Sequence, residues 1–266
     1  MKKKLILPLL AIIFVCNSCG NKFEKLVKSN DNELKYEKAL AYYEKKEYDK
    51  ALVLLEDVLG VFRGSNKIET IYFYYAFCHF KQKEYLSAAT YFKNFANTFP
   101  SSKFAEEANF MIGQSYYELS PNYRLDQTHS TEAIGAYQAF ANNFPESNRV
   151  ATCNKIIDEL RLKLKTKAFE QAQLYYKISD FQAAAHTYKS FIADFPEASE
   201  IEQARFMIVK SYFQQASNTI EIKQKERFEQ VVEAYTDFVE KHPKSKFSAE
   251  AASLEKFSVA RIKKLN

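Results

Sequence analysis

The chain has 266 residues, with 38 Lys and Arg against 33 Asp and Glu, but only 5 Gly and 6 Pro. Because Gly and Pro are the residues that interrupt helices, so few of them predict long unbroken helices. Loss of the first 18 residues would remove three lysines and no acid, which leaves 35 basic against 33 acidic residues. This balance does not suggest nucleic-acid binding, which requires a concentrated basic face.

The first 18 residues have the layout of a secretory signal. Three lysines precede an apolar run, residues 5–15, that is too short to cross a bilayer, since crossing takes about 20 residues. Cys19 follows the small residue Ser18 at the end of this signal. It resembles the cysteine of bacterial lipoproteins, whose thiol takes a diacylglycerol and whose amine is acylated after cleavage. We therefore expect lipid attachment at Cys19, with an ordinary secretory signal as the alternative.

An internal repeat organises the rest of the chain. Four segments carry an aromatic residue, a Phe three residues later and a Pro five residues after that. The four sets are Phe92, Phe95 and Pro100; Tyr137, Phe140 and Pro145; Tyr188, Phe191 and Pro196; and Tyr235, Phe238 and Pro243. Residues three apart share a helix face, and Pro cannot continue a helix. Each copy therefore predicts the end of one helix, a sharp turn and the start of the next.

Small or acidic residues that suit helix N-caps follow each of these prolines. They are Ser101, Ser102, Glu146, Ser147, Glu197–Ser199 and Ser245. Ser199 and Glu202 also have the spacing of a capping box. We expect these side chains to cap the helices that follow the turns.

A small residue, or Val in the last copy, precedes each aromatic pair on the second helix of a repeat: Ala88, Ala133, Ala184 and Val231. A further small residue lies on the preceding first helix: Ala76, Gly113 and Ala172. The first repeat has Ala39 and Ala51 at these positions but lacks the proline. This pattern resembles the tetratricopeptide repeat, a helix pair of about 34 residues. It predicts an all-α tetratricopeptide-repeat solenoid of five helix pairs, closed by a capping helix near Ser245–Lys264. The expected pairs are 32–62, 66–98, 102–143, 147–194 and 198–241.

Three further features shape the expected domain organisation. Residues 148–177 predict one unbroken helix, and the extra residues around 120–130 and 216–225 are expected in loops, where repeat proteins place insertions. We expect a signal peptide over 1–18, a lipidated N-terminal tether over 19–31 and a single repeat domain over 32–266.

The sequence carries no recognisable catalytic or cofactor motif. It has no Gly-rich phosphate loop, and its four histidines stand at no metal-ligand spacing. We expect neither catalytic residues nor a metal or cofactor, and we interpret the chain as a protein-binding scaffold rather than an enzyme. Cys78 and Cys153 are expected to pack as small apolar side chains, with a disulfide between them as the alternative.

Aromatic residues flank the small residue of each first helix in the early repeats. They are Tyr36, Tyr43, Phe73, Phe77, Phe80, Phe110 and Tyr117. In tetratricopeptide repeats the flanking offsets line a concave groove that holds a peptide. The alternative is that these rings only complete the buried stripe of the helix, since all of them except Phe77 lie within about 60° of the small residue. We keep both interpretations for this set, which we name the aromatic ladder.

The whole assembly resembles the BamD family, in the form found in Bacteroidetes-type bacteria. Tyr175–Pro196, Tyr123–Thr128 and Phe62–Ser65 carry the resemblance most specifically. It implies a lipoprotein scaffold of the outer-membrane β-barrel assembly (BAM) complex, anchored by lipid on the periplasmic side of the outer membrane. The implied partners are a BamA-type barrel protein and unfolded outer-membrane β-barrel proteins. The alternatives are a Tol–Pal-type periplasmic scaffold and a glycan-binding outer-membrane lipoprotein.

Overall fold

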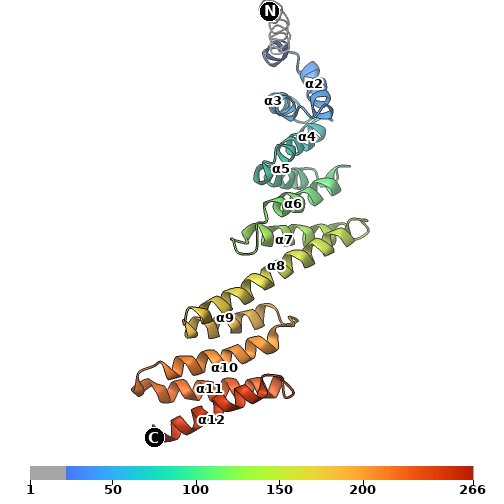
Figure 1. Ribbon diagram of the computed structural model, residues 1–266. Coiled ribbons are helices and arrows are strands. Elements are labelled where there is room, and N and C mark those ends of the chain that lie inside the picture. Colours follow the sequence, from blue (N-terminus) through green and yellow to red (C-terminus); the bar gives the residue numbers. More distant parts are fainter. Residues whose placement is uncertain (1–21, 266) are drawn as a thin grey trace, which may run out of the picture. The chain divides into compact units, whose positions relative to one another are not determined.

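The computed structural model describes residues 22–265, and over this range the chain forms helices and no strand. The signal and Cys19 lie outside the described residues. The helices are α2 (Asn32–Glu44), α3 (Tyr48–Leu59), α4 (Ile68–Lys81), α5 (Tyr85–Thr98), α6 (Ala105–Leu119), α7 (Thr128–Asn143), α8 (Val150–Lys177), α9 (Phe181–Asp194), α10 (Ile201–Ser217), α11 (Glu221–Lys241) and α12 (Ser248–Lys264), as labelled in Figure 1. None of the helices between residues 22 and 265 is long and apolar enough to cross a membrane.

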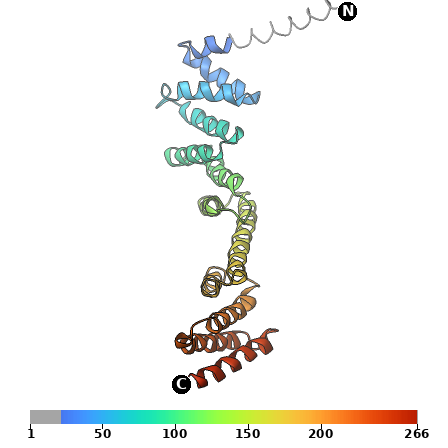
Figure 2. The same ribbon diagram turned by 60° about the vertical axis from the view of Figure 1, so that its left-hand side comes forward.

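The chain divides into two compact units. Unit 1 holds the residues up to Pro121 together with Asp126–Asp158, and unit 2 holds Asn122–Leu125 and the residues from Glu159 onward. Within each unit, successive helices run antiparallel and pack side by side (Figures 1 and 2). The five helix pairs and the closing helix α12 begin and end within a few residues of the predicted bounds. The predicted all-α tetratricopeptide-repeat fold is therefore confirmed, and the predicted long helix is α8, with 28 residues.

The four Phe–Pro or His–Pro turns share one backbone geometry. The residue before each proline has φ near −130° and ψ near 60°, measured as −127° and 59° at Phe99 and −136° and 63° at His242. Its N–H donates to the carbonyl four residues earlier, at 2.8 Å for Phe99 and 2.9 Å for His242. Pro forces the preceding residue out of the helical region, so each proline ends its helix in the same way.

The residues after these prolines do not cap the helices as predicted. The side chains of Ser102 and Ser147 accept hydrogen bonds from the N–H groups two residues later, at 3.2 Å each, inside the turn rather than at the helix start. Ser199 donates to Glu200 at 3.0 Å, and Glu202 accepts from Ser245, so the predicted capping box does not form. Serine hydroxyls readily stabilise such two-residue turns, and here the helices begin only after the turn is complete.

Gly113 marks a close approach of helices α6 and α7 in unit 1. A Cβ placed on Gly113 would lie 2.8 Å from the ring of Tyr137 on α7, closer than carbon atoms tolerate. Tyr137 is fully buried, and its hydroxyl donates to Gln114 Oε1 at 3.0 Å, so the ring cannot move aside. The small residues Ala39, Ala76 and Ala172 on the other first helices are also fully buried. Glycine at position 113 thus permits a helix contact that alanine would obstruct.

Residues 22–27 form a helical segment that the sequence interpretation did not predict. Phe23, Leu26 and Val27 pack against the core of the first helix pair, and the Phe23 ring meets Tyr42 edge-on at 5.7 Å. Their spacing of three and four residues places them on one helix face. The end of the expected tether is thus part of the packed structure, while the predicted domain bounds remain a prediction.

The extra residues of the fifth repeat lengthen its helices instead of forming a loop. α10 and α11 have 17 and 21 residues, and only residues 218–220 separate them. The segment Glu221–Lys241 is rich in Glu, Lys, Gln and Arg, which are strong helix formers, and it lacks Gly and Pro. The expected loop around 216–225 was therefore wrong.

Cys78 and Cys153 are both buried and are not joined in a disulfide. Burial raises the pKa of the Cys78 thiol to about 12. The expectation that both cysteines pack as small apolar side chains is confirmed.

Candidate protein-binding site

The aromatic ladder lies in unit 1, and its members differ in burial. Phe73 belongs to the core, with 7% of its surface exposed, and its ring stacks on Phe104 at 4.3 Å. The other six rings are half-buried. Phe77 packs edge-on against Phe73 at 4.8 Å and against Phe92 at 4.9 Å. Phe73 is therefore a core residue that completes the buried stripe of its helix, and it does not line an open groove.

The remaining ladder rings each pack one side on the core. Tyr43 contacts Tyr74 edge-on at 4.7 Å, and Phe80 contacts Tyr85 at 5.2 Å. Tyr36 lies 6.0 Å from Phe62. Burial is the main cause that raises the pKa of Tyr43, so this hydroxyl is neutral at physiological pH. These rings therefore hold the repeat together and still present apolar surface along α2 and α4.

Phe110 and Tyr117 continue the ladder on α6. Phe110 lies 5.7 Å from the ring of Tyr137 and 5.6 Å from Phe140, and the guanidinium of Arg149 stands 4.8 Å over its face. Tyr117 is half-buried four residues after Gly113. The six half-buried rings thus follow one another along the first helices of three successive repeats.

The histidine of the second repeat is a packing residue. His79 is 8% exposed, its Nδ1 lies 2.6 Å from Glu84 Oε2, and its ring stacks on Tyr91 at 4.8 Å. Among residues 22–265, no group of three or more His, Cys, Asp and Glu side chains is placed to hold a metal ion.

A second face of the first helices carries a feature that the sequence interpretation missed. In the third repeat, Asn109, Ile112 and Tyr116 of α6 form the floor of a hollow of about 470 Å³. α5 and α7 form its walls, with Gly135 and Ala136 among the wall residues. These three floor residues stand four residues before, one residue before and three residues after Gly113. The hollow is therefore on a different side of α6 from Phe110 and Tyr117.

The fifth repeat has an equivalent hollow within unit 2. Arg205, Ile208 and Tyr212 of α10 line this hollow and have the same offsets from Val209 as the α6 residues have from Gly113. The volume of the hollow is about 430 Å³. Ala234 of α11 corresponds to Ala136 of α7, since each stands three residues after the small residue of its helix. Its rim is charged, because Arg205 pairs with Asp237.

The charged rim of the fifth-repeat hollow has a second basic member. The Lys189 ammonium lies 5.2 Å over the Tyr212 ring. The ion pair between Arg205 and Asp237 has a counterpart in the first repeat, where Lys35 pairs with Asp57 at the same positions of the helix pair.

The second repeat fills this position with a ring. Tyr91 stands where the other two repeats have alanine, and it contacts Tyr75 and His79 at 4.8 Å each. Tyr75 and His79 are only 7% and 8% exposed. In these three repeats, the residue three places after the small residue of the second helix therefore distinguishes a filled position, at Tyr91, from open ones, at Ala136 and Ala234.

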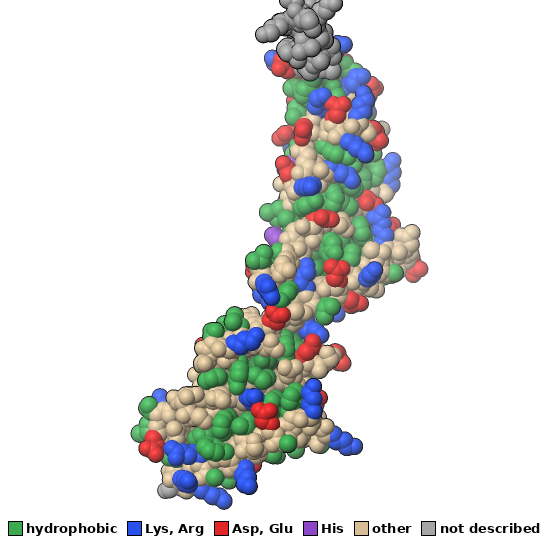
Figure 3. Space-filling view, in the orientation of Figure 1, with side chains coloured by type: hydrophobic (Ala, Val, Ile, Leu, Met, Phe, Trp, Pro, Cys, Tyr) green, Lys and Arg blue, Asp and Glu red, His purple; other side chains and the backbone are tan. Residues whose placement is uncertain are grey.

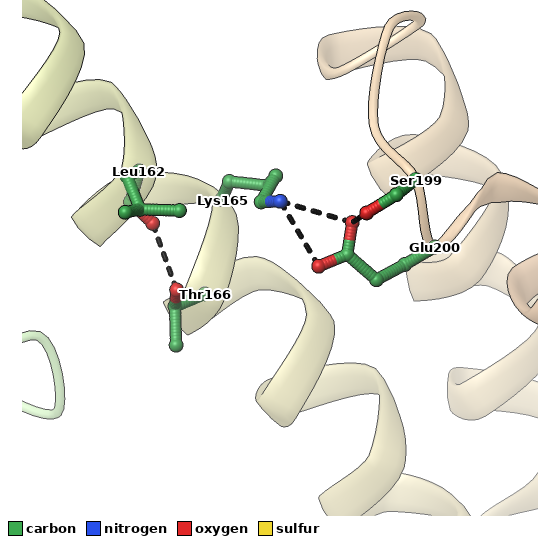
Figure 4. A network of polar contacts seen from close by, with 5 residues as sticks. All are labelled: Leu162, Lys165, Thr166, Ser199 and Glu200. Atoms are coloured by element: carbon green, nitrogen blue, oxygen red, sulfur yellow. Dashed lines mark hydrogen bonds and ion pairs between the residues drawn. The ribbon is translucent and has the colours of Figure 1, made fainter.

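A charged contact joins neighbouring repeats in unit 2 (Figure 4). The Lys165 ammonium of α8 donates to both carboxylate oxygens of Glu200 at 2.9 Å, and the Ser199 hydroxyl donates to the same carboxylate. Burial works to raise the pKa of Glu200, but the hydrogen bonds from Lys165, the backbone and Ser199 outweigh it, so this pKa is lowered.

The surface charges are mixed rather than segregated. On the face seen in Figure 3, Lys and Arg side chains alternate with Asp and Glu side chains along both units. No basic stripe of the kind that tracks nucleic acid is visible there.

Stacked antiparallel helix pairs, identical proline turns and small residues at the helix contacts define a tetratricopeptide-repeat protein. The chain belongs to the YfiO family, described as outer membrane lipoproteins, whose model matches residues 28–188 and 165–261.

One curated relative and two solved structures are similar to this chain. The relative is the putative outer membrane protein assembly factor BamD of Aquifex aeolicus, 26% identical over 210 residues that cover 78% of this chain and 68% of the relative. The TPR2AB-domain:pHSP90 complex of yeast Sti1 is 15% identical to this chain, with 86% of this chain and 98% of that chain covered, and has a TM-score of 0.40. The P58(IPK) TPR domain is 14% identical, covers 91% and 68%, and has a TM-score of 0.43.

Proposed function

We propose that this protein is a lipid-anchored scaffold of the outer-membrane β-barrel assembly machinery. In this proposal it binds the periplasmic domains of a BamA-type barrel protein and helps to insert β-barrel proteins into the outer membrane. The proposed assembly role is supported by the name of the relative in Aquifex aeolicus. The proposed outer-membrane location is supported by the lipoprotein family to which the chain belongs. It acts by binding and not by catalysis.

The observation that carries the binding role is the exposed edge of the aromatic ladder. Six half-buried rings follow one another along α2, α4 and α6 in unit 1. Strands of barrel proteins alternate apolar and polar residues and carry aromatic girdles. Neutral aromatic edges in a row suit such segments while they are unfolded, because ring contacts add to apolar burial.

The binding test is a pulldown with a synthetic peptide from the C-terminal strand of an outer-membrane barrel protein. Phe80→Ala and Tyr117→Ala together should weaken peptide binding about thirtyfold or more, since hot-spot aromatic residues contribute at least about 1 kcal/mol each. The control is Tyr116→Ala, which removes a neighbouring half-buried ring from the other side of α6. Circular dichroism verifies that each variant is folded. Equal retention by the ladder double variant and by Tyr116→Ala would refute the groove.

The partner assignment has its own test. Detergent-solubilised membranes should yield a BamA-type barrel protein on affinity purification of the full chain. Recovery of Tol–Pal components without a barrel assembly partner would show that the assembly role is wrong.

The proposed anchor is tested at Cys19. Cys19→Ala should move the protein from the membrane pellet into the soluble fraction, because two or three acyl chains otherwise bind the bilayer with about 0.8 kcal/mol per buried CH₂. Intact-protein mass spectrometry of the wild type should show the added acyl groups. A wild-type mass without acyl groups, together with unchanged fractionation of the variant, would exclude the anchor.

A further inference from the structure

The start of the described chain is tied closely to the first repeat. Phe23, Leu26 and Val27 are packed against the core of the first helix pair, and the Lys50 ammonium lies 5.9 Å from the Phe23 ring and 5.2 Å from the Tyr42 ring. The N–H of Lys28 donates to the carbonyl of Glu24 at 3.1 Å, which closes the last helical turn of the segment. The segment is thus held to unit 1 by side-chain packing on one face.

This packing limits the distance between the first repeat and any lipid on Cys19. Four residue steps separate Cys19 from Phe23, and a fully extended chain spans at most about 14 Å over four residues. An acylated cysteine lies in the headgroup layer, which is roughly 5–7 Å thick on each side of the bilayer. An anchor at Cys19 therefore cannot let the first helix pair move far from the membrane.

The opposite face of the segment is basic. Lys22, Lys25 and Lys28 are exposed, and their spacing of three residues places them on the side away from Phe23 and Leu26. Glu24 is the one acidic residue within this segment, so its net charge is +2. Lysines next to a membrane favour an anionic surface, at roughly a fivefold gain in affinity for each residue.

We propose that segment 22–28, which is helix 22–27 and the turn residue Lys28, seats the first repeat directly on the lipid surface, with Lys22, Lys25 and Lys28 on anionic headgroups. This inference rests on the proposed anchor at Cys19 and goes beyond it, because it assigns a face of the protein to the bilayer. The short reach brings the segment to the membrane, and its lysines orient it. The aromatic ladder of unit 1 then begins beside the membrane instead of at the end of a long tether.

Collisional quenching on membranes tests this arrangement. The acylated full chain is labelled with bimane at Asn30→Cys, or at Asn142→Cys in α7 as a distant site of unit 1, both exposed. The native Cys78 and Cys153 are buried, so the label goes to the introduced thiol. The vesicles contain phosphatidylethanolamine, phosphatidylglycerol and a headgroup spin-labelled lipid. We expect severalfold stronger quenching at residue 30 than at residue 142.

A charge-matched pair of variants tests the lysines. Changing Lys22, Lys25 and Lys28 together to Gln should lower the quenching at residue 30 and remove its dependence on salt. Changing the exposed Lys256, Lys263 and Lys264 of α12 to Gln alters the net charge equally and should leave that quenching unchanged. Mass spectrometry confirms acylation in every sample.

The outcomes separate this inference from the proposed anchor. Equal quenching at residues 30 and 142 in acylated protein, or equal effects of the two lysine triples, would overturn the membrane-facing segment while the anchor stands. Protein without acyl groups would overturn the anchor. The unacylated chain then tests the segment by co-sedimentation with phosphatidylglycerol vesicles at low salt. The Lys22, Lys25 and Lys28 triple must weaken that binding at least tenfold more than the α12 triple does.

Discussion

The second and third repeats of unit 1 have the same helix pair but fill it differently. In the second repeat, Tyr91 packs on Tyr75 and His79 and leaves both rings less than a tenth exposed. In the third repeat, Ala136 stands at the same position and a hollow of about 470 Å³ remains. One side chain per repeat thus decides whether the outer side of a first helix is core or surface.

The third repeat also differs from the second at the small residue of its first helix. A Cβ placed on Gly113 of α6 would lie 2.8 Å from the Tyr137 ring, so α6 has no room there for the side chain that Ala76 carries at the same position of the second repeat. The fifth repeat has the open arrangement again within unit 2, with Ala234 beside its hollow. The repeats therefore share a backbone pattern and distribute their packing over different faces.

The largest effect is expected from Gly113→Leu. The side chain would overlap the buried Tyr137 ring, and overpacking of this kind lowers the free energy of unfolding by about 3 kcal/mol. Urea unfolding measures the change. Gly135→Ala on α7 is the control, because a Cβ there meets nothing within 4 Å, and it should raise stability by about 0.5–1 kcal/mol. Similar midpoints for both variants would show that the close contact at Gly113 is not real.

Tyr91→Ala should convert the second repeat to the open arrangement. Loss of a half-buried ring and of its contacts with Tyr75 and His79 should lower the free energy of unfolding by about 2 kcal/mol. The reciprocal Ala136→Tyr has room in the hollow and should change stability by less than about 1 kcal/mol. Thermal unfolding compares the two variants. A larger loss for Ala136→Tyr than for Tyr91→Ala would contradict the assignment of filled and open repeats.

The turn between the helices of the second repeat offers a smaller effect. Lys83 has φ of 65°, a left-handed conformation that disfavours a side chain, as do Lys46 and Ser179 at the corresponding turns. Lys83→Gly should raise the free energy of unfolding by up to about 1 kcal/mol, after the greater freedom of Gly in the unfolded chain is subtracted. Lys93→Gly within α5 should instead lower it by about 1 kcal/mol. Destabilisation by both variants would mean that the turn carries no backbone strain.

The smallest effect concerns the contacts between repeats. Glu200 has a lowered pKa when folded, so its stabilising contribution is present above the ordinary Glu pKa of about 4.3 and is lost as the pH falls through the folded value. Lys165→Met should therefore lower the free energy of unfolding by less than about 1 kcal/mol at neutral pH. Near pH 3, roughly the acid end of the Glu200 titration, the loss should be smaller still. Chemical unfolding at both pH values measures this. If the difference in unfolding free energy between wild type and Lys165→Met grew on acidification, the predicted direction of the pH dependence would be wrong.

Much of the fold follows from local patterns. The bounds of α4 to α12 match the predicted pairs because periodic apolar residues and Pro act within a few residues. The fifth-repeat insertion escaped prediction because Glu- and Lys-rich sequence suits helix and exposed loop alike. Segment 22–27 was missed because its two turns become stable only when packed on the first core.

The site was predicted less completely. The aromatic ladder was found from its spacing, but spacing could not place Phe73 in the core and the other six rings at its edge. Phe73 is covered because Phe104, which begins the next repeat, stacks upon it. The hollows were missed because an alanine in a sequence does not show whether a neighbouring ring fills the space beside it.

By itself, the sequence determined the helix pairs, the four identical turns and the small residues at their contacts, because each depends on interactions within one or two helical turns. Only the tertiary structure decided which faces are filled, since the volume beside a side chain depends on residues from adjacent helices. Tyr91 closes one repeat and Ala136 leaves the next open through that packing alone. The same reason places Phe23 on the first core, and with it the face that we propose for the membrane.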